Sequence, residues 1–273
     1  MTTFLSRLER LGRTDSTQRV VREWLAAGVA EVCVATADEQ RDGRGRHGRA
    51  WTAPPGVALL VSSGFRPERL AARHAWRLGA IVALAMLDAA EDVAGLRDGA
   101  LGLKWPNDVV IDGPDGTLRK IAGVLGESAL EGDLVASAVV GIGVNADWPA
   151  ATFPAQLAAS MSSLHEASGG RPIDREALLE GWLGRLEPRY EALADGVFDA
   201  GGWTTRQRTT GRRVEVDTGS SVIFGRGVGV DPASGALLVE EPGVAAPRAV
   251  GTGEVLRCRI IERPRLQVLD GQP

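Results

Sequence analysis

The chain has 273 residues, of which 44% are hydrophobic and 24% charged, and its formal net charge at pH 7 is −4. This length and composition predict one large domain with a small appended one. The acidic balance argues against a general nucleic-acid binder, because affinity for a phosphate backbone comes from summed positive charge. The first 13 residues lack an apolar signal region, and no apolar run approaches the ~18 residues of a membrane span. We therefore expect a cytoplasmic protein that binds neither DNA nor membrane.

Cysteine and lysine usage adds two expectations. Cys33 and Cys258 lie far apart in apolar stretches without metal-ligand spacing, which predicts reduced core residues. Of the 31 basic residues, Lys104 and Lys120 are the two lysines, which leaves 29 arginines. Lysines kept in so arginine-rich a chain indicate positions that need a compact ammonium on a rotatable stem. The alternative is that the two lysines are present by chance and have no such requirement.

The first predicted element is a helix after the polar residues 14–18. Apolar residues recur at helical spacing from Val20 to Leu25, and the pattern stops at Gly28. Asp15 or Ser16 is the expected N-cap. A polar ligand is an equally good explanation for the hydroxyl groups here, because a helix N-terminus offers free N–H groups.

A valine-rich strand at residues 31–37 leads into the loop 40–51, which reads QRDGRGRHGRAW. Its glycines are Gly43, Gly45 and Gly48, and its arginines are Arg44, Arg46 and Arg49. The glycines let backbone N–H groups approach a ligand, and the arginines supply forked, charged donors. The loop therefore predicts a cradle for phosphate and carboxylate. A solvated basic loop of the RGG type, which binds nucleic acid loosely, is the alternative.

A strand at 57–63, a long helix at 71–93 and a strand at 101–104 are expected next. The last strand ends in the proline-stiffened turn KWPND, which presents Lys104, Asn107 and Asp108. A carboxylate beside phosphate-binding cations is typical of a magnesium ligand or a hydroxyl acceptor. An Asn-Asp turn that satisfies its own backbone is the alternative.

An antiparallel meander follows, with turns at 113–116 and 131–133 and strands at 118–127 and 134–140. It ends in GIGVN at 141–145, where the two glycines let a ligand or another backbone pack closely against the strand. The side-chain amide of Asn145 could bind a ring such as adenine, because it offers one hydrogen-bond donor and one acceptor side by side.

The remaining sequence predicts helices and then a small β domain. A short helix opens at residues 161–164, and a second long helix at 175–198 should be interrupted at Pro188. From Gly211 onward, short valine-rich strands alternate with glycines, which indicates a small β-barrel. We expect an α+β fold in which a mixed, mostly antiparallel sheet is flanked by helices. The boundary lies near the glycine pair 201–202, giving domains 1–205 and 206–273.

Four motifs, GRGRHGRAW, KWPND, KIAG (residues 120–123) and GIGVN, stand in this order and together resemble the biotin protein ligases, or biotin–[acetyl-CoA-carboxylase] ligases. The resemblance covers nearly the whole chain. It implies a class II synthetase-like catalytic domain of the biotin/lipoate ligase type and an SH3-like C-terminal barrel. No helix-turn-helix module precedes Phe4, so the chain looks like the short class without an N-terminal DNA-binding domain.

The resemblance implies an ATP-dependent ligase. Biotin and ATP with Mg²⁺ would form biotinyl-5′-AMP, and a lysine of a biotin carboxyl carrier protein of an acyl-CoA carboxylase would then take the biotin. The residues that match biotin contacts are Ser16, Thr17, Gln40, Gly43, Arg44 and Lys120. Those that match ATP or adenylate contacts are Arg46, Arg49, Trp51, Asn107 and Asn145. The residues that match catalytic positions are Arg46, Lys120, Lys104 and Asp108, and Asp108 is also the candidate Mg²⁺ ligand.

Two other functions compete. A lipoate or octanoate ligase or transferase has the same fold, but Gln40 and the Ser16-Thr17 pair favour a polar ureido ring over an aliphatic tail. Gln18 departs from the family pattern, because many relatives carry Asn there. A non-enzymatic RNA-binding protein is the second rival. The net charge of −4 and an aromatic content of 5% argue against it, since stacking on single strands needs aromatic side chains.

Overall fold

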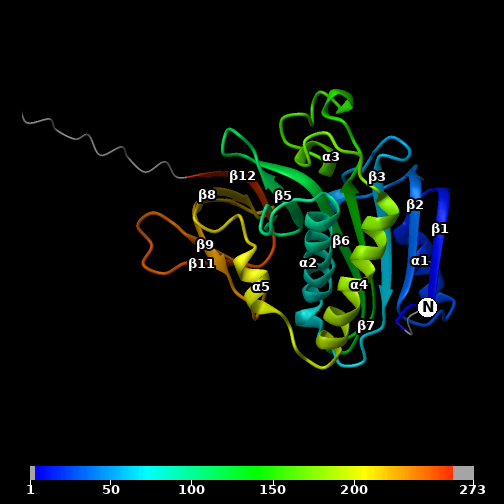
Figure 1. The fold of residues 1–273 in the computed structure, drawn as a ribbon. Helices are drawn as coiled ribbons and strands as arrows, with labels where there is room; N and C mark the ends of the chain where they lie inside the picture. Colours follow the sequence, from blue (N-terminus) through cyan, green and yellow to red (C-terminus); the bar gives the residue numbers. More distant parts are fainter. Residues whose placement is uncertain (1–3, 261–273) are drawn as a thin grey trace, which may run out of the picture.

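The computed structural model describes residues 4–260. A seven-stranded sheet flanked by helices forms its larger part, and a five-stranded antiparallel sheet forms a smaller, barrel-like part beside it (Figure 1). The expected combination of a mixed sheet with helices and a small C-terminal β domain is confirmed. In the described part of the chain, no helix has the length and apolar character to cross a membrane.

The large sheet has the strand order β1-β2-β3-β7-β6-β5-β4. Its strands are β1 (Arg7–Thr14), β2 (Cys33–Gln40), β3 (Ala58–Phe65), β4 (Leu101–Lys104), β5 (Asp108–Asp112), β6 (Leu118–Glu131) and β7 (Leu134–Asn145). β1 and β2 are parallel, and every other neighbouring pair is antiparallel. β2 runs to Gln40 and therefore delivers the chain directly into the arginine loop.

Helices cover the two faces of this sheet unequally. α2 (Trp76–Val93) and α4 (Arg175–Ala194) pack side by side on one face (Figure 1). α1 (Thr17–Ala26) packs on the other face, against β2, β3 and β7. Successive side chains of β2 point to opposite faces of the sheet, so this strand contributes to the core on both sides. Val34 joins the core under α2 and α4, while its neighbours Cys33 and Ala35 pack against α1. Both cysteines are free and buried, as expected.

Two helix predictions need correction. α4 is continuous through Pro188 and ends at Ala194, four residues before the expected end. A proline costs the helix one hydrogen bond. The buried side chains of Trp182, Leu186 and Tyr190 lie on both sides of Pro188, and this packing holds the helix together. The helix expected from residue 71 starts at Trp76, after a 3₁₀ turn at Ala72–His74.

The smaller sheet has the order β11-β10-β9-β8-β12. Its strands are β8 (Arg212–Asp217), β9 (Val222–Val230), β10 (Leu237–Glu240), β11 (Arg248–Val250) and β12 (Glu254–Ile260), and the remaining helices are α3 (Leu164–Ala167) and α5 (Ala200–Thr205). The segment after α5 joins the two sheets. The N–H of Leu103 donates to Arg206 O at 2.8 Å, and the N–H of Arg208 donates to Leu103 O at 2.7 Å.

A buried carboxylate anchors this junction. Glu91 is 2% exposed and accepts hydrogen bonds from the Arg206 guanidinium at 3.0 Å and from the Leu101 N–H at 2.8 Å. Asp88 accepts a further bond from Arg206 at 3.0 Å. The cluster ties the start of the C-terminal part to α2 and β4.

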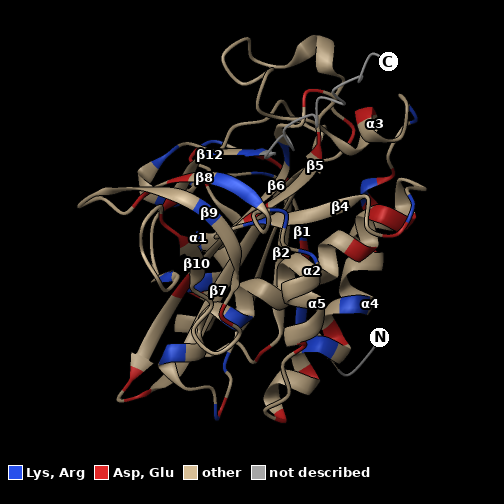
Figure 2. Cartoon of the chain, turned by 90° about the vertical axis from the view of Figure 1, so that its left-hand side faces the viewer, with Lys and Arg blue, Asp and Glu red and all other residues tan. Residues whose placement is uncertain are grey.

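Elsewhere, arginines pair with acids across the surface. Pairs such as Arg22 with Glu127 and Arg175 with Asp38 join separate elements. In the view of Figure 2, acidic and basic residues are interspersed and no large face carries one sign. Such exposed pairs contribute little stability each, whereas Glu91 is the one buried carboxylate among residues 4–260, so its loss should matter more.

We predict that Glu91→Ala lowers the free energy of unfolding by about 3 kcal/mol, because it leaves the Arg206 guanidinium and the Leu101 N–H without their buried partner. Urea denaturation measures this change. Glu23→Ala is the control, because the Glu23 side chain is 68% exposed and 3.8 Å from Arg19. Equal, small losses in the two variants would contradict the anchoring role.

Candidate active site

A cavity of about 630 Å³ opens on the α1 side of the large sheet, between the arginine loop, β5, β6 and β12. It brings together nearly every residue that the sequence analysis assigned. Those lining it are Ser16, Thr17, Gln40, Arg44, Arg46, Arg49, Trp51, Lys104, Asn107, Asp108, Lys120 and Asn145. Gly43 lies just behind this lining. A Cβ atom added there would clash with the carbonyl of Trp51 and come 3.2 Å from Gln40 Nε2, so glycine lets the loop start against β2.

Glycines on β6 and β7 make the cavity deep. Gly143 pairs with Gly123 across the two strands, and neither places a side chain on the cavity face. The Trp51 indole packs on this bare strip. A Cβ atom added at Gly143 would come within 2.6 Å of its ring. The close approach expected at GIGVN is therefore made, in this structure, by a side chain of the arginine loop.

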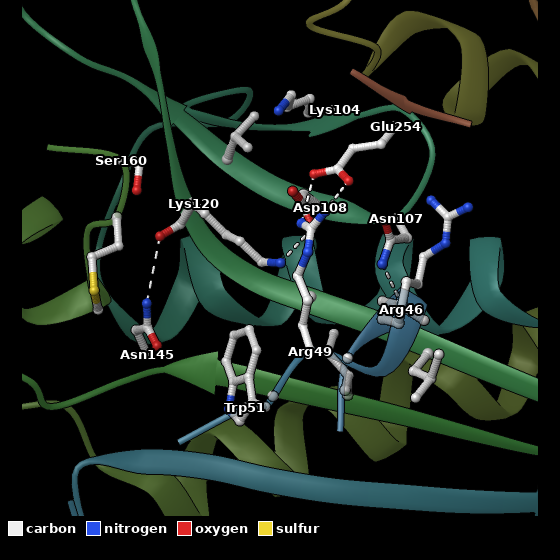
Figure 3. Close-up of a pocket in the computed structure, with 18 of the residues that line it drawn as sticks. Arg46, Arg49, Trp51, Lys104, Asn107, Asp108, Lys120, Asn145, Ser160 and Glu254 are labelled. Atoms are coloured by element: carbon white, nitrogen blue, oxygen red, sulfur yellow. Dashed lines mark hydrogen bonds and ion pairs between the residues drawn. The ribbon is translucent and has the colours of Figure 1, made fainter. Parts of the chain in front are cut away.

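Lys120 lies at the centre of the cavity (Figure 3). Its Nζ is 2.6 Å from Asp108 Oδ1 and 5.2 Å from the centroid of the Trp51 ring. Its backbone is fixed on both sides, since its N–H donates to Ser160 O at 2.9 Å and its carbonyl accepts from the Ser162 N–H at 2.8 Å. The ammonium is thus held by a carboxylate and an aromatic face, while its side chain remains 34% exposed.

The two asparagines of the motifs use their amino groups on the backbone. Asn145 is 3% exposed and donates to Ser162 O at 2.8 Å, which holds the 160–162 segment against β7. The Asn107 side-chain amide donates to Val124 O at 2.7 Å, and the Asn107 backbone carbonyl accepts from the Val124 N–H at 2.9 Å. Both residues therefore shape the cavity wall. Their contact with adenine or ATP stays a prediction.

The arginine loop docks on the C-terminal sheet. Arg46 opens a short 3₁₀ turn and donates to Gly253 O at 3.0 Å. Burial lowers the pKa of Arg46 from its usual value, and the guanidinium still carries its charge at neutral pH. Arg49 forms a bidentate ion pair with Glu254, and this arginine holds the pKa of the Glu254 carboxyl below its usual range. Figure 3 shows Arg49 pointing between Glu254 and Asp108.

The opposite end of the cavity is uncharged. Ser16 occupies the N-cap position of α1, but its side chain makes no capping hydrogen bond. Gln40 caps the helix instead, since its Oε1 accepts from the Thr17 N–H at 2.8 Å. Of the two explanations weighed for these hydroxyls, the structure therefore leaves Ser16 free of a capping role and exposed to the cavity.

The contribution of β12 was not predicted from the sequence. Glu254 and Cys258 line the cavity. The available signal was the run Gly-Thr-Gly-Glu at 251–254, where a charged residue follows closely spaced glycines. Burial raises the pKa of the Cys258 thiol, so it stays protonated at neutral pH and is a poor nucleophile.

Comparisons with known proteins agree with this geometry. Residues 11–145 match the model of the biotin/lipoate A/B protein ligase family. The chain is 34% identical to the biotin–[acetyl-CoA-carboxylase] ligase of Paracoccus denitrificans, over 85% of this chain and 93% of that protein. This chain belongs to the biotin protein ligase family.

Further relatives support the membership. The bifunctional ligase/repressor BirA of Bacillus subtilis is 30% identical over 83% of this chain and 67% of that protein. The solved structure of the biotin protein ligase from Aquifex aeolicus in complex with biotin and ATP has a TM-score of 0.73 and 27% identity, and it covers 91% of this chain and 97% of that chain. The biotin protein ligase resemblance inferred from the four motifs is confirmed. Which ligand each cavity residue contacts stays a prediction.

In this biotin protein ligase family member, we predict that Glu254→Ala frees the arginine loop from β12. Trypsin should then cut after the loop arginines about threefold faster, because native cleavage requires local opening and the variant lacks the ion pair that opposes it. Limited proteolysis followed by mass spectrometry measures the rate at each arginine.

Glu241→Ala is the matched control, because Glu241 pairs with Arg248 at 3.7 Å within the same C-terminal part. Cleavage of the arginine loop should stay at the wild-type rate in this variant. Equal acceleration in both variants would mean general loosening of the domain rather than release of the loop.

Proposed function

We propose that this chain joins biotin to AMP and then transfers the biotinyl group to a lysine of a biotin carboxyl carrier protein in the cytoplasm. One observation supports this reaction above all. One cavity is lined by the ammonium of Lys120 on β6 and the guanidinium of Arg46, and also by the uncharged groups of Ser16, Thr17 and Gln40 where α1 begins and β2 ends, three strands away from β6 in the sheet. Biotin has the matching polarity, with an anionic carboxylate at one end and a neutral ureido ring at the other.

In the first step, a carboxylate oxygen of biotin attacks the α-phosphorus of ATP. The bond from that phosphorus to the bridging oxygen of the β-phosphate breaks, and pyrophosphate leaves with the electron pair. Two anions meet in this step, so fixed cations lower the barrier. In this proposal Lys120, which pairs with Asp108, would contact both the carboxylate and the α-phosphate, and Arg46, whose guanidinium donates to Gly253 O, would face the same phosphate.

Magnesium is part of this proposal. Within residues 4–260, no group of three or more His, Cys, Asp or Glu side chains could hold a metal ion by itself. Mg²⁺ fits the cavity nevertheless, because it binds through one or two carboxylates together with substrate phosphates. Asp108 would be the protein ligand, and the ion would neutralise charge on the leaving pyrophosphate.

In the second step, the ε-amine of the carrier lysine attacks the acyl carbon of biotinyl-5′-AMP. An amide forms, and AMP leaves. The chain contains no Met-Lys-Met sequence of the carrier type, so the acceptor is a separate protein. Between the two steps, the mixed anhydride must be shielded from water and from other amines. The arginine loop, docked on β12 beside the cavity, is placed to provide this shield.

We predict that Arg46→Gly slows adenylate formation without abolishing it and no longer retains the adenylate, because the guanidinium proposed to face the α-phosphate is removed together with its hydrogen bond to Gly253 O. Released biotinyl-5′-AMP would then label lysines of an unrelated protein such as albumin. Streptavidin blotting of albumin incubated with enzyme, biotin and ATP measures this labelling. Labelling no stronger than with wild type, despite adenylate formation, would exclude the retention role.

The reaction itself is tested by pyrophosphate release from ATP with biotin, lipoate, octanoate or no acid. We expect release with biotin alone. Release with lipoate or octanoate in its place would move the chain to the lipoate-type branch and remove the reason for assigning Gln40 to a ureido ring. Absence of release with every acid would refute the adenylation proposal.

A further inference from the structure

Ser62 is a buried polar residue at the uncharged end of the cavity. It lies on β3, is 1% exposed and lines the cavity. It pairs with Ala35 on β2 and with Gly141 on β7, in a cross-strand row on the cavity face. A Cβ atom added at Gly141 would lie 3.1 Å from Ser62 Oγ. The hydroxyl and the Gln18 amide oxygen, which would lie 3.0 Å from the same Cβ atom, both extend over the backbone of Gly141.

A directed chain of hydrogen bonds runs from this hydroxyl to Gln40. The Thr17 N–H donates to Gln40 Oε1 at 2.8 Å, Thr17 Oγ1 donates to the same oxygen at 3.1 Å, and Thr17 Oγ1 lies 2.8 Å from Ser62 Oγ. A backbone N–H can only donate, so the side-chain atom that faces it is the amide oxygen of Gln40. Thr17 gives its one hydroxyl proton to Gln40 and must accept the proton of Ser62.

The direction of these hydrogen bonds determines which groups of Gln40 remain for a ligand to bind. With Oε1 occupied by Thr17, the Gln40 Nε2 group, which makes no hydrogen bond within residues 4–260, has its two donors available at the cavity, beside Gly43. A urea carbonyl is a strong acceptor and matches these donors, whereas the dithiolane of lipoate or the tail of octanoate has no such group. Ser62 keeps the Thr17 hydroxyl turned toward Gln40 and thereby keeps the amide fixed.

We propose that Ser62 is a positioning residue for recognition of the ureido ring, acting through Thr17 on Gln40. The proposal rests on the function proposed above, because it concerns the ring end of the same biotin site. Thr17 is 2% exposed, so no solvent is available to replace a lost bond to its hydroxyl. Loss of the Ser62 hydroxyl should therefore loosen the Gln40 amide without touching the cations that bind phosphate.

The neighbouring serine provides a matched control. Ser63 is 0% exposed, and its hydroxyl donates to Val140 O at 3.2 Å. It points to the opposite face of β3, because successive side chains of a strand alternate. Ser63→Ala thus removes an equally buried hydroxyl from the same strand and leaves the network of Thr17 and Gln40 intact.

The experiment is steady-state pyrophosphate release with Ser62→Ala, Ser63→Ala, Gln40→Ala and the double variant of Ser62 and Gln40. We expect Ser62→Ala to raise KM for biotin about tenfold, the effect of one buried hydrogen bond, and to leave KM for ATP and kcat within about twofold. Ser63→Ala should leave all three constants near wild type. In the Gln40→Ala background, Ser62→Ala should add less than about twofold, because its effect passes through Gln40.

Two results would overturn the assignment: equal changes in Ser62→Ala and Ser63→Ala, or fully multiplicative effects in the double variant. If thermal unfolding shows that Ser62→Ala is not folded, Ser62→Cys keeps the side-chain shape, slightly enlarged, with a weaker donor and should raise KM for biotin by a smaller factor. An unchanged KM would count against the proposal. Failure of the wild-type protein to release pyrophosphate with biotin would instead refute the proposed function, and this inference with it.

Discussion

The half-covered face of the large sheet is the constraint on which the site depends. α1 fills that face over one end of β2, β3 and β7. Beyond the helix, Gly123 and Gly143 place no side chain on the strands, and the Trp51 ring packs directly on the backbone there. A methyl group at Gly143 would collide with this ring. The positions of the glycines in the paired strands therefore set the depth of the cavity, and the charged groups do not.

Charge is brought to this hollow by elements that are distant in sequence. Lys120 comes from β6, Asp108 from the start of β5, and the arginines from the loop after β2. β12 adds Glu254, which holds Arg49, and Gly253 just before this strand adds the backbone carbonyl that holds Arg46. The C-terminal sheet thus has a specific task in this structure, because it anchors the arginine loop beside the cavity. Glu91 and Arg206 in turn keep that sheet attached to the first.

Local sequence patterns predicted the parts of the fold that local physics determines. Valine-rich strands, the hairpin turn at 131–133 and the apolar faces of the long helices were all recognised, because each depends on residues within a few positions of one another. β1 was not identified. It is a half-exposed edge strand in which Arg7, Glu9, Arg10 and Arg13 obscure the alternation. The continuity of α4 through Pro188 could not be foreseen either, since it depends on packing against α2.

The residues of the site also fall into those that local sequence predicted and those that it did not. The motif residues were found because glycines, arginines and the two lysines are unusual in their spacing or rarity. Ser62 and Glu254 carry no such signal. The hydroxyl of Ser62 matters because the strand register sets it opposite Gly141 and within reach of Thr17, and Glu254 matters because β12 folds back onto a loop 205 residues earlier in the chain. Contacts of this kind become visible in the assembled structure.

The most direct test of the account is the intact mass of a biotin carboxyl carrier domain after incubation with this protein, biotin and ATP. The account predicts that the domain gains the mass of one biotinyl group and that a carrier whose acceptor lysine is replaced by arginine gains none. A carrier domain that stays unmodified, or equal labelling of the two carriers, would contradict the claim that this cavity activates biotin and passes it to a specific lysine.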